Sequence, residues 1–190
     1  MDGQAILHFL GNPTLETERL VLRRLTLDDA PDIFAYASDP EVTRYLLWDT
    51  HASLEDSVKF IQWSMDRYEK DEAGEWGIVL KETGRLIGCM GIVKLNSAHF
   101  CAEIGYVLSK PHWRKGYMPE ALRRLIRFCF EDLGLNRVEA VHAVENGASG
   151  RVMQKAGMSY ERTLRQKAFT KGRFWDVKAY SVLKSDGLPT

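Results

Sequence analysis

The sequence has few of the features that mark several large classes of protein. It contains only three cysteines in 190 residues, and none of them stands in a Cys-x-x-Cys pair. This predicts free thiols in a reducing compartment rather than a disulfide framework. No apolar stretch approaches the length of a membrane span, and the short run at residues 6–10 lacks the basic segment of a secretory signal. We therefore expect a cytoplasmic protein that makes no membrane contact.

An excess of charge is missing as well. The 26 basic and 26 acidic side chains give a formal net charge of zero, which argues against nucleic acid as a partner. His51, His99 and His112 show no metal-ligand spacing, so we expect no metal site. The chain also lacks a Gly-x-Ser-x-Gly elbow, a P-loop and a Gly-x-Gly-x-x-Gly fingerprint. Serine hydrolysis and nucleotide phosphoryl transfer are therefore disfavoured.

The composition is that of one globular domain. With 45% apolar and 27% charged residues, the chain can bury a substantial core. We divide it into an N-terminal extension at residues 1–16, a single domain at 17–184 and a C-terminal tail at 185–190.

The hydrophobic pattern predicts a mixed α/β domain around a central, mostly antiparallel sheet. Thr26 resembles the start of a capping box, and Asp39-Pro40 predicts the start of a short helix. The expected helices are 28–38, a short one from 40, 54–70, about 121–133 and 149–156. The expected strands are 19–25, 76–80, 86–95, 100–108, 137–144, about 158–168 and 174–184.

The segment from Glu103 to Leu122 carries the most chemical information. A strand leads into a polar loop and then into the N-terminus of an amphipathic helix. Such a junction binds anions well, because helix N-termini present free backbone N–H groups. Gly116 would let a phosphate approach the backbone, while Arg114 and Lys115 add positive charge. An ordinary strand–helix turn with a solvated basic pair is the alternative.

This loop resembles a known motif. Arg114-Lys-Gly-Tyr-Met118 is similar to [Q/R]-x-x-G-x-[G/A], the pyrophosphate motif of the GNAT superfamily of N-acetyltransferases. Trp113 and Met118 depart from the general motif as members of the ribosomal-protein N-terminal acetyltransferase branch do. Three further segments resemble that branch in family order: Thr-Glu-Arg-Leu-Val-Leu-Arg at 17–23, Ala-Glu-Ile-Gly-Tyr at 102–106, and the Asn-x-x-Ser block at 146–158. The matches span about residues 17–183.

The resemblance implies a GNAT fold. Such a fold has a sheet of about seven strands, mostly antiparallel, with a splayed parallel pair in the middle and about four flanking helices. The resemblance also implies that acetyl-CoA is the co-substrate, with pantetheine between the splayed strands and pyrophosphate at the helix start. The implied cofactor-binding residues are Tyr106, Val107, Leu108, Arg114, Lys115, Gly116, Tyr117, Met118, Asn146 and Ser149.

Two residues are the catalytic candidates. Glu103 is the one acidic residue of an apolar strand and matches the general base of the histone acetyltransferase branch; a structural Glu bonded to neighbouring backbone is the alternative. Ser149 matches the proposed proton donor to the CoA sulfur, although a helix N-cap would also explain it. Tyr160 and Tyr180 are further candidates for the acid. Ala168 stands near a second acidic base of the branch and cannot replace it.

One cysteine and two aromatic pairs are expected to be core residues rather than site residues. Cys129 lies on an apolar helical stripe and is expected in the core, as are the aromatic pairs Tyr45/Trp48 and Phe174/Trp175. The alternative for residues 45–49 is contact with the acceptor.

The resulting hypothesis is acetyl transfer from acetyl-CoA to a primary amine, above all to a protein N-terminus. A small amine as acceptor and a non-catalytic acyl-CoA-binding module are the alternatives. The sequence does not distinguish a monomer from a homodimer.

Overall fold

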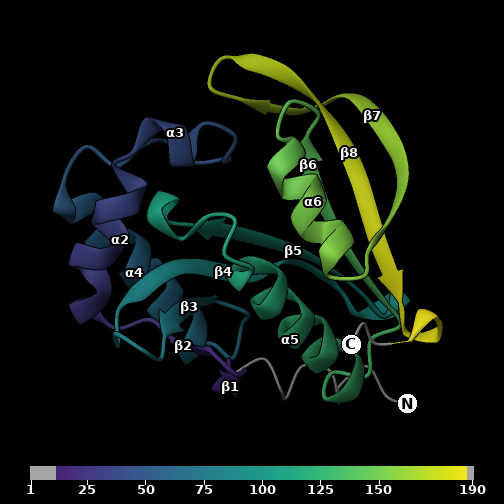
Figure 1. The fold of residues 1–190 in the computed structure, drawn as a ribbon, viewed down its shortest axis with the longest axis horizontal. Helices are drawn as coiled ribbons and strands as arrows, with labels where there is room; N and C mark the ends of the chain where they lie inside the picture. Colours follow the sequence, from purple (N-terminus) through teal and green to yellow (C-terminus); the bar gives the residue numbers. More distant parts are fainter. Residues whose placement is uncertain (1–11, 188–190) are drawn as a thin grey trace.

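A computed structural model describes residues 12–187 of the chain (Figure 1). They form one open sheet in the order β1-β2-β3-β4-β5-β6-β8-β7, in which β5 and β6 are parallel and the other described neighbours are antiparallel. The strands are β1 Leu15–Glu16, β2 Leu20–Arg24, β3 Glu75–Leu80, β4 Leu86–Asn96, β5 Cys101–Leu108, β6 Arg137–Ala143, β7 Ser159–Thr170 and β8 Arg173–Leu183. The α-helices are α2 Ala30–Ala37, α3 Pro40–Thr43, α4 Leu54–Glu69, α5 Tyr117–Glu131 and α6 Gly147–Lys155. This confirms the expected mixed α/β architecture.

The described residues hold one strand more than the expected seven, and one helix more than the expected four. The added strand is β1, a two-residue segment whose Leu15 pairs with Leu22 and is 3% exposed. The residues before it also pack, since the Asn12 amide donates to the carbonyl of Gly74 at 3.0 Å. Residues 12–16, assigned from sequence to the extension, therefore contact the domain. Residues 1–11 and 188–190 lie outside the described part of the chain.

Helices cover both faces of the sheet (Figure 1). On one face, α2 and α4 pack through Ile33 and Ile61 against Val79 and Cys89. On the other face, α5 and α6 cover the larger core, which includes Ile78, Ile104, Leu122, Val138 and Met153. None of the helices in residues 12–187 combines the length and apolar character that a membrane crossing requires.

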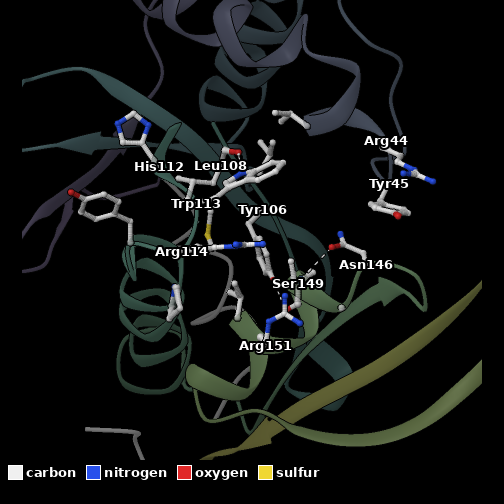
Figure 2. Close-up of a pocket in the computed structure, with 18 of the residues that line it drawn as sticks. Arg44, Tyr45, Tyr106, Leu108, His112, Trp113, Arg114, Asn146, Ser149 and Arg151 are labelled. Atoms are coloured by element: carbon white, nitrogen blue, oxygen red, sulfur yellow. Dashed lines mark hydrogen bonds between the residues drawn. The ribbon is translucent and has the colours of Figure 1, made fainter. Parts of the chain in front are cut away.

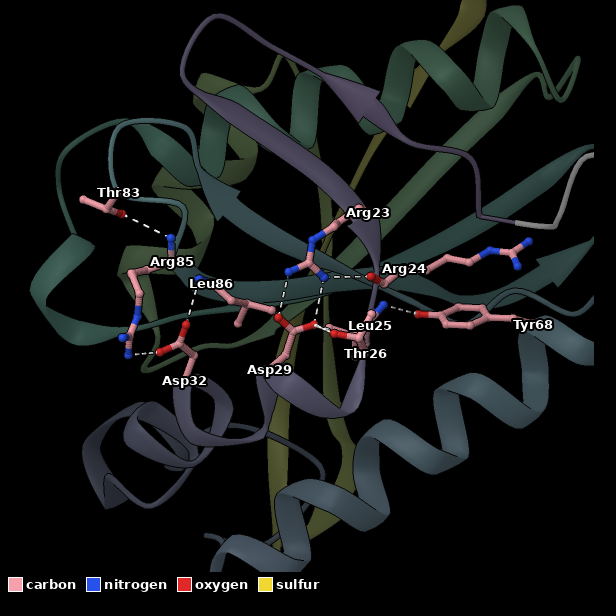
Figure 3. Close-up of polar contacts among 10 residues, drawn as sticks. All are labelled: Arg23, Arg24, Leu25, Thr26, Asp29, Asp32, Tyr68, Thr83, Arg85 and Leu86. Carbon is pink, nitrogen blue, oxygen red and sulfur yellow. Dashed lines mark hydrogen bonds and ion pairs between the residues drawn. The ribbon is translucent and has the colours of Figure 1, made fainter.

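The junction between β2 and α2 is a network of paired polar groups (Figure 3). Two Arg23 nitrogens donate to the two carboxylate oxygens of Asp29 at 2.8 and 2.7 Å. Asp29 also accepts from the backbone N–H of Thr26 at 2.8 Å, which confirms the predicted capping box. Burial opposes ionisation of Asp29, but the bonds from Arg23 and Thr26 outweigh it and lower its pKa. The network fixes where the first long helix leaves the sheet.

The parallel pair separates after a short contact. Cys101, Ala102 and Glu103 of β5 pair with Arg137, Val138 and Glu139 of β6. The two strands do not pair with each other beyond these positions. From Ile104 onward β5 therefore has a paired strand only on its β4 side. The predicted splayed pair is confirmed, and it opens a gap in the middle of the sheet.

Candidate active site

A cavity of about 490 Å³ opens beside the separated end of β5 (Figure 2). Its walls come from residues within 41–46, from 106–108 of β5, from 112–119 without Lys115, and from residues within 145–155, along the length of α6. The volume lies within the range of about 300–1,000 Å³ usual for small-molecule sites. Segments far apart in sequence therefore meet around one hollow.

The loop before α5 has the geometry of an anion site. Arg114 and Gly116 both adopt left-handed backbone conformations, with φ of 62° and 85°. Gly116 is the N-cap of α5, and no side chain caps that helix start. The first amides of α5 therefore have no intrahelical acceptor and can receive an anion. Of the predicted pyrophosphate residues, the structure places Arg114, Gly116, Tyr117 and Met118 in the cavity wall, and Lys115 outside it.

Tyr106, Val107 and Leu108 of β5 line the cavity, and their expected backbone contacts to pantetheine stay a prediction. One of these backbone polar groups already has a partner. The indole Nε1 of Trp113 donates to the carbonyl oxygen of Leu108 at 2.7 Å. This contact folds the loop back over the end of β5.

The start of α6 corrects one expectation. Ser149 is not the N-cap; it is the third residue of the helix. Asn146 is the N-cap, and its side-chain oxygen accepts from the backbone N–H of Ser149 at 3.3 Å. Both residue types favour this position, and Asn146 holds it because it lies at the non-helical turn, with φ −87° and ψ 61°. The hydroxyl of Ser149 is therefore free of the capping role.

That hydroxyl meets a tyrosine across the gap. The Oγ of Ser149 lies 2.9 Å from the hydroxyl of Tyr106, which also donates to the Ser149 carbonyl at 3.1 Å. Burial raises the pKa of Tyr106, and the contact with Ser149 offsets only part of that rise. Tyr106 is thus a neutral phenol at physiological pH. Sequence reasoning assigned Tyr106 only a backbone role and missed its hydroxyl.

The other tyrosines proposed as acids lie outside the cavity wall. Tyr160 is half exposed, and its hydroxyl lies 2.9 Å from that of Thr163. Tyr180 is buried, with its ring centroid 5.5 Å from that of His142.

Glu103 occupies the last position of β5 that pairs with β6, opposite Glu139. It is half-buried and does not line the cavity. Within residues 12–187 its carboxylate forms no hydrogen bond or ion pair, and Glu139 is instead paired with Arg137 at 2.5 Å. Glu103 thus stands where the strands diverge, and its role as base stays a prediction.

The cavity wall carries positive charge without local compensation. Its carboxylates, Glu41 and Glu145, pair with Lys110 and Arg173. Within residues 12–187, four cations of the wall form no ion pair: Arg44, whose guanidinium lies over the Tyr45 ring, Arg114, Arg151 and Lys155. Arg114 and Arg151 lie on the loop and α6 sides, whereas Arg44 lies across the cavity beside Tyr45 (Figure 2). Sequence analysis named only Arg114 among these cations. Arg44 has no local motif, and the block at 146–158, which contains Arg151 and Lys155, predicted site roles only for Asn146 and Ser149.

The part of the wall formed by residues 41–46 contacts the hairpin of β7 and β8. The rings of Tyr45 and Trp175 meet edge to face at 5.5 Å, and the Lys171 ammonium donates to the carbonyl of Thr43 at 2.5 Å. Trp175 is buried and Trp48 half-buried, whereas Phe174 is 61% exposed, so the expectation of a core position fails for Phe174.

The cysteines lie away from the cavity. Cys129 is fully buried, which confirms the core prediction, and burial raises its pKa to about 12. Cys89 is also buried and Cys101 half-buried, and all three thiols are free. Residues 12–187 contain no cluster of three or more His, Cys, Asp or Glu side chains suited to a metal ion.

The sequence profile described as "Acetyltransferase (GNAT) domain" matches residues 19–159. The chain belongs to the GNAT family of N-acetyltransferases. The uncharacterised N-acetyltransferase YoaA of Bacillus subtilis is 39% identical over 90% of this chain and 97% of its own. A spermidine N(1)-acetyltransferase of Vibrio cholerae is 24% identical over 88% of this chain and 94% of its own.

Solved structures agree with this fold. RimL, a ribosomal L7/L12 α-N-protein acetyltransferase solved with coenzyme A, superposes with a TM-score of 0.79. It covers 90% of this chain and 98% of its own at 19% identity. By their names, the spermidine acetyltransferase and RimL act on different kinds of amine, a polyamine and a protein N-terminus.

Proposed function

We propose that this N-acetyltransferase moves the acetyl group of acetyl-CoA directly to the N-terminal α-amino group of a protein. GNAT acetyltransferases use acetyl-CoA as donor, and the family of this chain is established by its match over residues 19–159. The protein acceptor is the part that is proposed.

The observation that supports acetyl-CoA as the donor is a cavity that joins an anion site to a polar pair. The free amides at the start of α5 suit the diphosphate, while Tyr106 and Ser149 lie where the strands have separated. A donor that extends from one to the other brings its thioester close to the Ser149 hydroxyl. A cavity with one charged end and one half-buried polar pair suits acetyl-CoA better than a compact ligand.

The proposed reaction has a balanced proton path. The neutral amine attacks the thioester carbon, the C–N bond forms and the C–S bond breaks. Glu103, directly or through water, takes the amine proton, and Ser149 supplies a proton to the leaving thiolate. Tyr106 holds the Ser149 oxygen by a hydrogen bond, and the proton taken by Glu103 returns to that oxygen through water, which restores both side chains. Positioning of the two substrates supplies the rest of the rate.

The charges of the wall favour a peptide over a polyamine. A polyamine carries several cations and needs several unpaired carboxylates around it. Here Glu41 and Glu145, the carboxylates of the wall, are already paired. A protein N-terminus brings one amine on an otherwise neutral backbone and needs no such cluster.

Release of CoA thiol from a panel of amines tests the acceptor. The panel contains lysine-free peptides with a free N-terminus, the same peptides with a blocked N-terminus, free amino acids and spermidine. We expect turnover with the free peptides only, and mass spectrometry should place the acetyl group on the α-nitrogen. Preferred acetylation of spermidine or an amino acid would replace the protein acceptor by a small amine. Tight CoA binding without any turnover would identify an acyl-CoA-binding module.

A further inference from the structure

A clamp outside the cavity holds the loop that precedes α5. Arg19, just before β2, donates from Nε to Glu120 Oε2 at 2.7 Å and from Nη1 to the Lys115 carbonyl at 3.1 Å. Its guanidinium carbon lies 4.5 Å from the ring centroid of Tyr117. A single side chain thus contacts the loop, the first residue of α5 and the first turn of that helix.

Glu120 is held in place from the same segment. Its Oε1 accepts from the Thr17 hydroxyl at 2.6 Å and from the Arg19 backbone N–H at 3.0 Å. Burial of Glu120 opposes ionisation, yet the bonds from Thr17 and Arg19 lower its pKa overall. The carboxylate is therefore ionised at neutral pH. It holds Arg19, from which it is separated by 101 positions in the sequence.

The loop needs such an anchor because its backbone is strained. Arg114, a non-glycine residue, has φ of 62°, a conformation that costs about 1–2 kcal/mol for an L-residue. Lys115 lies between the two left-handed residues, and Arg19 binds its carbonyl oxygen. The position of that carbonyl sets the direction of the amides that follow it.

We propose that Arg19 is a positioning residue for the donor: clamped by Glu120, it fixes the Lys115 carbonyl and thereby the amides that receive the diphosphate. The inference rests on the proposed use of acetyl-CoA at this loop. Arg19 does not line the cavity, and its charge is paired with Glu120 at 2.6 Å. It acts through the loop and does not touch the diphosphate.

Substitution of Glu120 distinguishes a positioning role of Arg19 from simple attraction between its charge and the diphosphate. Removing a carboxylate near an anion site should tighten anion binding if only long-range charge mattered. If Glu120 instead holds the clamp, Glu120→Gln should weaken binding. Arg19→Lys makes a second distinction, because an ammonium keeps the charge but cannot bind Glu120 and the Lys115 carbonyl in the fork geometry of arginine.

The experiment measures CoA affinity by calorimetry, and kcat/KM with two donors. The donors are acetyl-CoA and S-acetylpantetheine, which lacks the diphosphate. Arg19→Gln, Arg19→Lys and Glu120→Gln should each weaken CoA binding by about 10- to 100-fold. They should leave kcat/KM for S-acetylpantetheine within about two-fold, because that donor makes no use of the loop amides. Arg23→Gln breaks a comparable pair in β2, the strand that follows Arg19, away from the cavity, and should leave CoA affinity unchanged.

The outcomes distinguish the inference from the function on which it rests. If the unmodified protein binds no CoA, the proposed function fails. If it binds CoA and Arg19→Gln binds equally well, the positioning role fails. An equal loss of kcat/KM with both donors, together with a lowered melting temperature, would show that Arg19 only stabilises the fold. Full CoA affinity in Arg19→Lys would show that the positive charge at position 19 is sufficient and that the fork geometry of arginine is not needed.

Discussion

The β2–α2 junction and the cavity are both rich in charge, but they differ in how the charge is matched. At the junction, Arg23 pairs with Asp29, and Asp32 pairs with Arg85 while accepting from the backbone N–H of Leu86 at 3.0 Å (Figure 3). In the cavity, Arg114 and Arg151 have no carboxylate partner among residues 12–187 (Figure 2). A satisfied polar group stabilises one geometry, whereas an unsatisfied one retains its capacity to bind a ligand. The contrast predicts which substitutions change stability and which change activity.

Glu103 gives the largest expected effect and the sharpest test of the contrast, because its carboxylate has no partner among residues 12–187 although it lies outside the cavity wall. Glu103→Gln keeps the shape and removes proton acceptance, so kcat should fall by about 10²–10⁴-fold while CoA still binds. The acidic limb of the pH–rate profile should also flatten. Glu139→Gln is the matched control, since Glu139 is its paired neighbour on β6. Near-normal turnover in Glu103→Gln would make this carboxylate structural.

Ser149→Ala should come next. Loss of the hydroxyl that faces Tyr106 removes the proposed proton donor, and kcat should fall by about 10²-fold with a smaller change in CoA affinity. Ser181→Ala is the control, because the Ser181 hydroxyl donates to Glu161 at 2.6 Å and lies outside the cavity wall. Equal turnover in both variants would remove Ser149 from the mechanism.

Gly116→Val should weaken CoA binding by about 10- to 100-fold. A side chain at φ 85° is strained, and its Cβ would lie 3.3 Å from Arg19 Nη2, so the Arg19 guanidinium must move by a few tenths of an ångström. Gly134→Val is matched in strain, with φ of 66°, but a Cβ there meets no atom within 4 Å. Both variants should lose about 1–2 kcal/mol of stability. Unchanged calorimetric CoA affinity in folded Gly116→Val would contradict the anion site.

The smallest expected effect is a change of stability at the β2–α2 junction. Asp29→Asn should lower the free energy of unfolding by about 1–3 kcal/mol at pH 7 without changing CoA affinity. Because the pKa of Asp29 is lowered in the folded state, its contribution is present above the unfolded pKa of about 3.9 and is lost as pH falls through the folded value. Urea unfolding of both proteins should therefore converge in acid. A constant difference down to pH 2 would contradict this assignment.

Local patterns predicted most of the fold, because each depends on neighbours in sequence. The period of apolar residues gave α4, and Asp39-Pro40 marked the start of α3, where the Asp39 carboxylate accepts from the Glu41 N–H at 2.8 Å. β1 was missed because two residues show no period, and only pairing with β2 makes them a strand. Asn146 and Ser149 both suit an N-cap, so backbone geometry had to decide between them.

The site was less predictable than the fold. The loop at residues 114–118 carries its own signal in glycine and basic residues. Arg44 and Arg151 have no such signal, because surface cations on helices are common and only tertiary packing aims them at a cavity. The contact between Arg19 and Glu120 joins two segments whose motifs were both recognised, but sequence gave no sign that they touch.

The indole of Trp113 is a natural optical reporter of donor entry. It is 36% exposed in the cavity wall and bonds to the Leu108 carbonyl, one of the groups expected to face pantetheine. A donor that takes this carbonyl exchanges one hydrogen bond for another, at little net free energy, yet it changes the polarity around the indole. Fluorescence emission should therefore shift on CoA addition. Of the five tryptophans in the chain, Trp113 should account for most of that shift.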